Sequence, residues 1–228
     1  VLDAAITIAG SEQAYREKPF MFCASVPAAP LAGTDFNLEL LMTCADREIP
    51  LLYYSCPAVG GNSPATLAGS LTLATADWLA ALAMHQLRRP GAPVCTFGYT
   101  MQLMEMRTLI WSYSAPEMQL AYAAVADLAH WYGFPAWGIV LESDYPRLNA
   151  QAGAEMSAGA LWAMLGNVEL VHNVGGLGAG KLLSAEAAVF ADEIIAYARA
   201  AVQPLAVSEK AIQESVALIG EKGPLGEY

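Results

Sequence analysis

Two carboxylates and a histidine follow apolar stretches that are expected to be buried strands, a position from which they could carry acid–base chemistry. Glu142 and Asp144 come directly after the apolar stretch 136–141, and His172 lies near the end of the stretch 168–173. A carboxylate in such a place can act as a general acid or base, or it can balance the charge of a cationic substrate. Two plainer interpretations stay open, namely a solvated loop with an ion pair to a nearby arginine and a structural histidine.

A second group of chemically capable residues lies in the segment 99–114, which is longer and more apolar than a solvated loop needs to be. It carries Tyr99, Arg107, Trp111 and Tyr113. Aromatic faces suit a quaternary ammonium, which has no N–H donors and is held by cation–π attraction of about 0.5 to 2 kcal/mol per face. We therefore expect this segment to fold over the site, with core packing of the same rings as the alternative.

The glycine-rich segment 175–181 matches the phosphate-binding pattern GxxxxGK but lacks the residue that this pattern requires next. Leu182 stands where a Ser or Thr would ligate magnesium, and the preceding strand is the last one expected rather than the first. We therefore disfavour nucleotide binding and expect a tight turn that lets a ligand approach the backbone. His85 and His130 fall late in expected helices, so no metal site built on histidines is expected.

Short apolar stretches alternate with longer helical ones along the chain, and this alternation predicts an α/β fold with a parallel sheet. The expected strands span residues 20–26, 51–56, 93–99, 136–141 and 168–173. The expected helices span residues 34–48, 64–88, 115–132, 148–165, 185–203 and 208–220. One βα unit takes about 37 residues, so a barrel of eight units would need roughly 300 residues and this chain holds about five units. An open doubly wound sheet and a barrel both agree with this spacing.

In either architecture the chemistry belongs at the carboxyl ends of the strands, in the loops that lead into helices. Those loops are the long ones here, whereas returns such as 89–92 are short. Ser63 and Ser114 come shortly before prolines and are expected to cap the helices that follow. The apolar helix near 65–87 is expected to be buried on most of its circumference.

The composition disfavours several classes of protein. The 228 residues carry a net charge of −11 and a pI near 4.6, a balance that repels nucleic acid and anionic lipid headgroups. The mean hydropathy is high, +0.37, but no run of about 18 uncharged apolar residues predicts a membrane span. The cysteines at positions 23, 44, 56 and 95 suggest free thiols in a reducing cytoplasm. The chain begins at Val1 rather than at Met, and we expect it to be a fragment or a processed chain.

A set of short motifs extends over most of the chain. They are the segments 62–69, 105–108, 114–117, 149–155 and 172–175, followed by Ser184, Glu186 and 192–194. Together these motifs resemble the carboxyl-terminal barrel half of the trimethylamine methyltransferase family. The segment 62–69, for example, is similar to that family's Ala-Pro-Val-Thr-Leu-Ala-Gly stretch. The match covers most of this chain but only about half of a typical family member.

The resemblance implies a TIM-type (β/α) barrel that is partial here, with about five βα units and C-terminal helices in one domain over residues 1–228, and with the amino-terminal strands missing. It also implies transfer of a methyl group from a methylated, quaternary amine to the cobalt of a corrinoid that a separate protein carries. This chain is therefore not expected to bind a cofactor tightly itself. It contains no pyrrolysine, and so is similar to the branch that includes glycine betaine methyltransferase.

With this resemblance, the candidate site residues fall into two groups. The catalytic or orienting candidates are Glu117, Glu142 and His172. The substrate-binding candidates are Tyr99, Arg107, Trp111, Tyr113 and Gln151. The three aromatic rings are expected to contact the ammonium, and Arg107 or His172 is expected to contact an attached carboxylate.

Departures from the family pattern occur at Asn149, Ala179 and Lys181. An isolated half barrel also exposes two sheet edges and cannot close its mouth. The alternative function is therefore a non-catalytic truncated or split barrel that requires a partner chain. A homo-oligomer is another form that such a chain could take.

Overall fold

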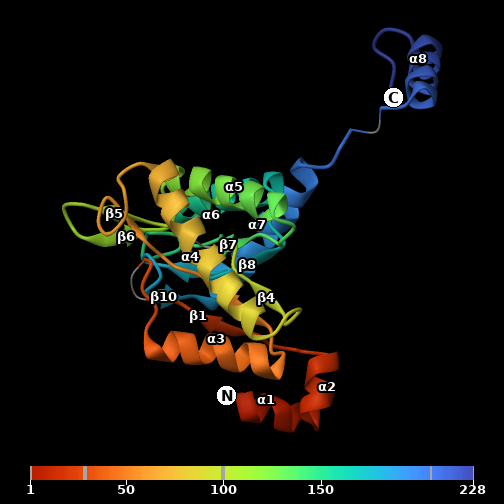
Figure 1. The fold of residues 1–228 in the computed structure, drawn as a ribbon. Coiled ribbons are helices and arrows are strands. Elements are labelled where there is room, and N and C mark those ends of the chain that lie inside the picture. Colours follow the sequence, from red (N-terminus) through yellow and green to blue (C-terminus); the bar gives the residue numbers. More distant parts are fainter. Residues whose placement is uncertain (1, 28–29, 99–100, 206, 228) are drawn as a thin grey trace.

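The computed structural model describes residues 2–27, 30–98, 101–205 and 207–227. It is a mixed α/β structure in which short strands alternate with helices (Figure 1). The helices are α1 (Leu2–Ala9), α2 (Glu12–Glu17), α3 (Asp35–Arg47), α4 (Leu67–Arg88), α5 (Pro116–Trp131), α6 (Ala150–Leu165), α7 (Ala185–Ala201) and α8 (Glu209–Lys222). The strands are β1 (Cys23–Ser25), β2 (Leu51–Tyr53), β3 (Ala58–Val59), β4 (Val94–Cys95), β5 (Gln102–Glu105), β6 (Ile110–Ser112), β7 (Trp137–Ile139), β8 (Leu170–His172), β9 (Gly176–Leu177) and β10 (Leu182–Leu183).

Short parallel strands form the centre of the molecule. Strands β1, β2 and β4 lie side by side in parallel, and β7 pairs in parallel with β8. A parallel bridge between Gly98 and Trp137 joins the two groups. The strands β1, β2, β4, β7 and β8 therefore follow one another in chain order. Each lies inside one of the five predicted stretches, which confirms the prediction of a parallel α/β arrangement.

The strands are shorter than the apolar stretches that predict them. Residues 20–22 precede β1, and the ring of Phe20 packs edge-on against Tyr15, with ring centroids 5.7 Å apart, instead of joining the sheet. Hydrophobic packing against a helix thus accounts for apolar residues that the pattern assigns to a strand.

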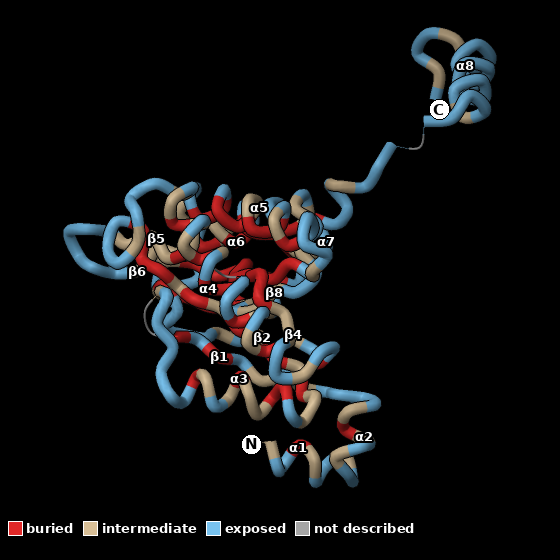
Figure 2. Tube along the Cα trace, viewed as in Figure 1, coloured by how far each residue is buried: buried red, intermediate tan, exposed pale blue. Residues whose placement is uncertain are grey.

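The helices that follow the strands cover one face of the sheet and build the core there. Helices α3 to α7 each pack against the next along the chain, as right-handed crossovers between neighbouring parallel strands require. Figure 2 shows the buried positions concentrated where α4, α5 and α6 meet the strands. Within this core Trp78 of α4 packs on Phe97 with ring centroids 5.0 Å apart. The four cysteines are free thiols.

Helix α4 is buried on one face only, so the prediction that most of its circumference is buried is wrong. It begins at Leu67, and the Oγ1 atom of Thr66 caps it by accepting from the Gly69 N–H, whereas Ser63 does not cap it. Its buried residues are Ser70, Ala74, Asp77, Trp78, Ala81 and His85.

Within the described ranges, α4 is long and apolar enough to cross a membrane, and 28% of the 18-residue apolar stretch that meets this criterion is buried. Core helices of soluble proteins also meet this criterion, so the finding is weak evidence of a span.

The segment 99–114 is not a plain loop, because it contains a β-hairpin. Strand β5 pairs in parallel with β3 and antiparallel with β6, which places Met104 opposite Trp111. Figure 1 shows this hairpin projecting from one side of the molecule. Its tip is exposed and includes Met106 and Leu109.

Helix α8 lies apart from the rest of the molecule at the end of an extended segment (Figure 1). None of its residues is buried, although Ile212, Val216 and Ile219 form an apolar stripe along it. The sequence predicts this helix at 208–220, close to its observed bounds. Its separate position is not a property that the helical pattern could reveal.

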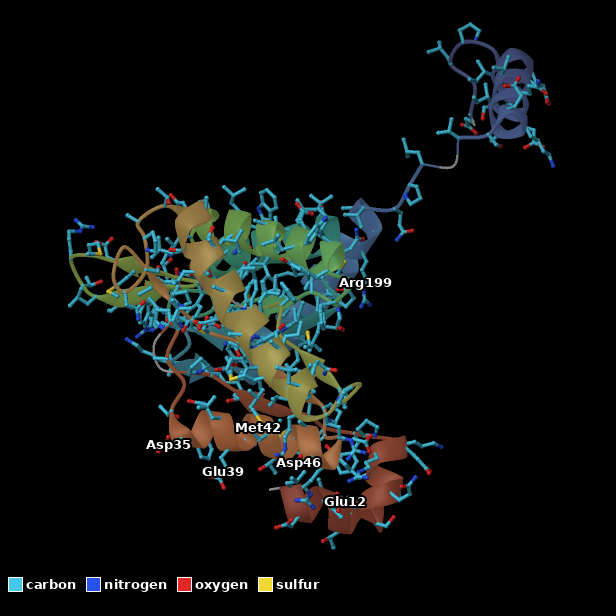
Figure 3. All side chains as sticks on the ribbon, viewed as in Figure 1. Glu12, Asp35, Glu39, Met42, Asp46 and Arg199 are labelled. Atoms are coloured by element: carbon cyan, nitrogen blue, oxygen red, sulfur yellow. The ribbon has the colours of Figure 1, made fainter. Side chains whose placement is uncertain are left out.

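Arginines tie together the elements that lie at the amino ends of the strands. Arg16 and Arg47 contact the carboxylate of Glu12 at 2.8 and 3.3 Å, and Arg88 contacts that of Asp46 at 2.7 Å. These hydrogen bonds lower the pKa of both carboxyl groups. Figure 3 shows Glu12 and Asp46 near one another where α2 meets the end of α3.

Candidate active site

A cavity of about 470 Å³ lies at the carboxyl ends of the central strands. Its aromatic lining residues are Tyr54, Trp111 and Tyr113, and its polar ones are Asn62, Gln102, His172 and Asn173. Among the described residues that line it, none is a lysine, an arginine or a carboxylate. The walls are therefore aromatic rings and neutral hydrogen-bonding groups.

The β5–β6 hairpin brings Trp111 and Tyr113 to this cavity, and Asp144 holds the end of the hairpin in place. The Asp144 carboxylate accepts hydrogen bonds from Ser112 Oγ at 2.5 Å, from the Tyr113 N–H at 2.8 Å and from the Ser114 N–H at 3.3 Å. Hydrogen bonds to a charged acceptor are stronger than neutral ones. The loop after β7 thus fixes the two rings through one side chain.

Ser114 does not cap α5 as predicted. The residue at the cap position is Ala115, which offers no side-chain hydrogen bond, and Pro116 opens the helix. Ser114 instead donates its hydroxyl to the backbone carbonyl of Glu142 at 2.9 Å. Because Asp144 binds the Ser114 backbone, tertiary contacts override the local capping pattern at this position.

Helix α6 supports the loop that carries Asp144. Glu155 accepts from Ser143 Oγ at 2.5 Å and from the Asp144 N–H at 3.0 Å. Gln151 donates to the other oxygen of Glu155 at 2.8 Å. Gln151 therefore acts on the loop through Glu155 and does not line the cavity.

Glu142 is a buried carboxyl group next to the cavity. Its side chain accepts from Asn173 Nδ2 at 2.8 Å, and the residue is 3% exposed. Burial raises the pKa of Glu142, and the hydrogen bonds from Asn173 and from the Gly180 backbone partly oppose that rise. It also lines a second cavity of about 260 Å³, which shares Asn173 with the first.

The glycine-rich segment makes room for this carboxyl group. It forms the β9–β10 hairpin, and a Cβ atom added at Gly176 would lie 3.0 Å from the carboxyl carbon of Glu142. The predicted tight turn is present, with positive φ angles at Gly175, Gly178 and Gly180. The group that this turn allows to approach the glycine backbone closely is the side chain of Glu142.

His172 stands at the end of β8 and lines the cavity. Its Nδ1 atom lies 3.0 Å from Oδ1 of Asn173, and its ring is 5.3 Å from that of Trp137. Burial lowers the pKa of His172, and the contact with Asn173 partly opposes this effect. Burial thus favours the neutral form of the imidazole.

The carboxylates around the cavity share one property, which is that neutral groups hold them. In the described part of the chain, no lysine, arginine or histidine nitrogen lies within 4.0 Å of the carboxylates of Glu142, Asp144 or Glu155. Their hydrogen-bond partners are hydroxyl, amide and backbone N–H groups, which leave the negative charge without an ion pair, although Lys181 lines the second cavity together with Glu142. Such a cleft concentrates cations.

The structure brings only some of the predicted site residues together. Those on or beside the cavity are Trp111, Tyr113, His172 and Glu142. Glu117 is exposed at the start of α5, and Arg107 is at the exposed tip of the hairpin, where it pairs with Glu105 at 3.0 Å. Neither lines the cavity. Tyr99 lies outside the described residues, and the catalytic and binding roles of all these residues stay predictions.

Sequence reasoning missed several residues that form or support the site. They are Tyr54, Asn62, Gln102 and Asn173 on the cavity; the sequence singles out Asp144 as a carboxylate but not as the support of the hairpin. Each lies near the end of an expected strand or in the loop that follows it, which is a usable signal. Within the described ranges, no group of three His, Cys, Asp or Glu residues could hold a metal ion.

Comparison with known proteins places the whole chain in one group. The family model described as Trimethylamine methyltransferase (MTTB) matches residues 1–228. A trimethylamine methyltransferase of Desulfitobacterium hafniense is 29% identical over 230 residues, which cover 100% of this chain and 45% of that protein. One of Methanosarcina thermophila is 30% identical, covering 92% of this chain and 44% of that protein. The glycine betaine methyltransferase of Desulfitobacterium hafniense is 32% identical, covering 85% and 40% respectively.

The chain spans less than half the length of these curated relatives. Among solved structures, a deoxyribose phosphate aldolase from Aeropyrum pernix aligns over 85% of this chain and 88% of its own. Its TM-score of 0.36 and sequence identity of 13% are too low to support an argument about fold or function.

Proposed function

Because the chain belongs to the trimethylamine methyltransferase family, we propose that it is part of an enzyme that removes a methyl group from a methylated, quaternary amine. The observation that carries this proposal is the set of carboxylates without basic partners behind an aromatic cavity. Cation–π attraction acts on a methylated ammonium, which has no N–H to donate. The uncompensated charge of Glu142, Asp144 and Glu155 attracts the same ligand over a longer range.

In this proposal, the residues that line the cavity contact different parts of the amine. Trp111, Tyr113 and Tyr54 present aromatic surface to the methyl groups, and neutral His172 adds no repulsion. Asn62 and Gln102 offer hydrogen bonds to a polar substituent of the amine. The role of these residues is to orient the methyl carbon and to exclude water from it.

The methyl acceptor in this proposal is the cobalt of a corrinoid that a separate protein carries. A corrinoid held by that protein would supply a nucleophilic cobalt with the electron pair for the new bond to carbon. The C–N bond breaks and its electron pair stays on nitrogen, so a quaternary amine leaves as a neutral tertiary amine. Membership in the family supports this partner, and glycine betaine and trimethylamine are the substrates named for the relatives.

The experiment compares a cation with an uncharged molecule of the same shape. Choline and its uncharged isostere dimethylbutanol are titrated into the chain by calorimetry, with glycine betaine and trimethylamine in parallel. We expect choline to bind at least tenfold more tightly than the isostere, since one or two cation–π contacts supply about that difference. Equal affinities would contradict the proposal. Methyl transfer to free cob(I)alamin then tests the reaction itself.

We further propose that the βα units belong to a TIM-type barrel. Parallel strands that follow one another in chain order, with their helices on one face, support a barrel over a doubly wound sheet, in which the strand order reverses. The site at the carboxyl ends of the strands agrees with that architecture.

One observation favours the second candidate function, a barrel that needs additional strands. Among the described residues, β1 and β8 each have a strand partner on one side only. Side chains from both edge strands, including Ala24 and Leu170, line one cavity of about 180 Å³. Light scattering tests this candidate, because open edges predict concentration-dependent association. A monomer at every concentration with cooperative unfolding would contradict it.

A further inference from the structure

We infer that Asn173 is a positioning residue that determines which nitrogen of the His172 ring carries the proton. It does so because its hydrogen bond to Glu142 fixes which way its side-chain amide points toward that ring. This inference deepens the proposed function and rests on it for its purpose.

The first step is that Glu142 orients the amide of Asn173. The two side chains meet at 2.8 Å, between Oε2 of Glu142 and the terminal amide of Asn173. An ionised carboxylate can only accept hydrogen bonds. The amide must therefore turn its NH₂ group toward Glu142, which turns its oxygen the other way.

The second step is that the oriented amide selects one form of the imidazole. Oδ1 of Asn173 lies 3.0 Å from Nδ1 of His172. An amide oxygen can only accept, so Nδ1 of the neutral ring must carry the hydrogen. Nε2 then holds the lone pair. A buried carboxylate thus selects the tautomer of the His172 ring without contacting that ring.

The third step concerns what this form does in the cavity. His172 lines the wall that the methylated ammonium would face. Nε2 itself is buried, so it acts on a ligand in the cavity through its field: a lone pair there attracts a cation, whereas an N–H dipole or an imidazolium would repel it. The lowered pKa of His172, which burial causes, keeps the ring neutral and agrees with this role.

The backbone at position 173 explains why asparagine suits it. Its φ angle is 63°, in the left-handed region that non-glycine residues rarely adopt. Asparagine tolerates this conformation better than most residues, and glycine tolerates it best. Glycine would supply the conformation without the amide. The substitution Asn173→Gly therefore removes the bridge between Glu142 and His172 with little backbone strain.

The test reads the His172 ring directly by NMR. Long-range nitrogen–proton spectra of the labelled chain at about pH 8 show which nitrogen of each of the three histidines is protonated, and His172→Gln assigns the signal. We expect the Nδ1–H form in the wild type and a mixture of both forms in Asn173→Gly.

Asn167→Gly is the matched control. Asn167 also has a positive φ angle, 50°, and it is exposed and does not line the cavity, so its substitution should leave the His172 spectrum unchanged. An Nδ1–H form that persists unchanged in Asn173→Gly, or an Nε2–H form in the wild type, would overturn the inference. Because the readout needs no ligand, a failure here is distinguishable from a failure of amine binding.

Discussion

Carboxylates at the two ends of the central strands have different kinds of partner. At the amino ends, Glu12 and Asp46 contact arginine guanidinium groups at 2.7 to 3.3 Å. At the carboxyl ends, Asp144 and Glu155 receive hydrogen bonds from hydroxyl, amide and backbone groups only. Both arrangements satisfy the oxygen atoms, but only the first cancels the charge.

This difference teaches that a carboxylate can be fixed in position with or without cancelling its charge. Paired charges at the amino ends contribute little to stability where they are exposed, and they present little net field to solvent. Carboxylates held by neutral donors are just as fixed in position, and they keep a negative potential beside the cavity.

The largest expected effect is on stability, from Asp144→Ala. Removing this carboxylate leaves the N–H groups of Tyr113 and Ser114 and the hydroxyl of Ser112 without their acceptor, at a cost of about 3 kcal/mol in the free energy of unfolding. Urea unfolding measures it. The control Asp127→Ala, an exposed position on α5, should change the value by less than about 0.5 kcal/mol. Similar losses in both variants would show that Asp144 is not the support of the hairpin.

A smaller effect is expected on binding, from Trp111→Ala. The lost aromatic face should weaken the affinity for tetramethylammonium by about 5- to 30-fold, which corresponds to about 1 to 2 kcal/mol. Calorimetry compares it with Trp131→Ala, a tryptophan 75% exposed at the end of α5. If both variants lose affinity equally, the cavity is not the binding site.

The third effect depends on pH and comes from Glu142→Gln. Burial raises the pKa of Glu142 above its ordinary value of 4.5, so its contribution to stability is present at low pH and is lost as the pH rises through the raised pKa. The isosteric amide does not titrate. The unfolding free energy of the variant relative to the wild type should therefore increase from about pH 4 to pH 8. A constant difference over that range would be inconsistent with the raised pKa.

The smallest effect is expected at the amino ends, from Arg88→Met. The pair with Asp46 is solvent-exposed, so its loss should change the unfolding midpoint only slightly, and the change should shrink further in high salt. The loss in Asp144→Ala should change little with salt, since its partners are neutral. An equal salt dependence of the two variants would contradict the claim that only the carboxylates at the amino ends are held by charged partners.

Helices were the most predictable part of this fold. Their apolar periodicity is local, so the predicted segment 185–203 agrees closely with α7 and 34–48 with α3. The parallel strands could be located by their apolar stretches, although not their lengths, because pairing depends on neighbours far along the chain.

The site was less predictable for the same reason. The aromatic residues Trp111 and Tyr113 could be singled out by composition, but the hairpin that carries them depends on pairing with β3. Arg107 resembles a ligand for a carboxylate in the sequence, and only the register of the hairpin shows that it lies at the tip. Asp144 could be located after a strand, but its contacts with residues 112–114 lie about 30 positions away.

The bridge between Gly98 and Trp137 has a consequence for sequence variation. A Cβ atom at position 98 would lie 2.0 Å from the indole nitrogen of Trp137, closer than any real contact. Since this bridge joins the strands β1, β2 and β4 to β7 and β8, no other amino acid fits there without moving the tryptophan. In a library randomised at position 98, glycine should be the residue that selection for a folded chain recovers.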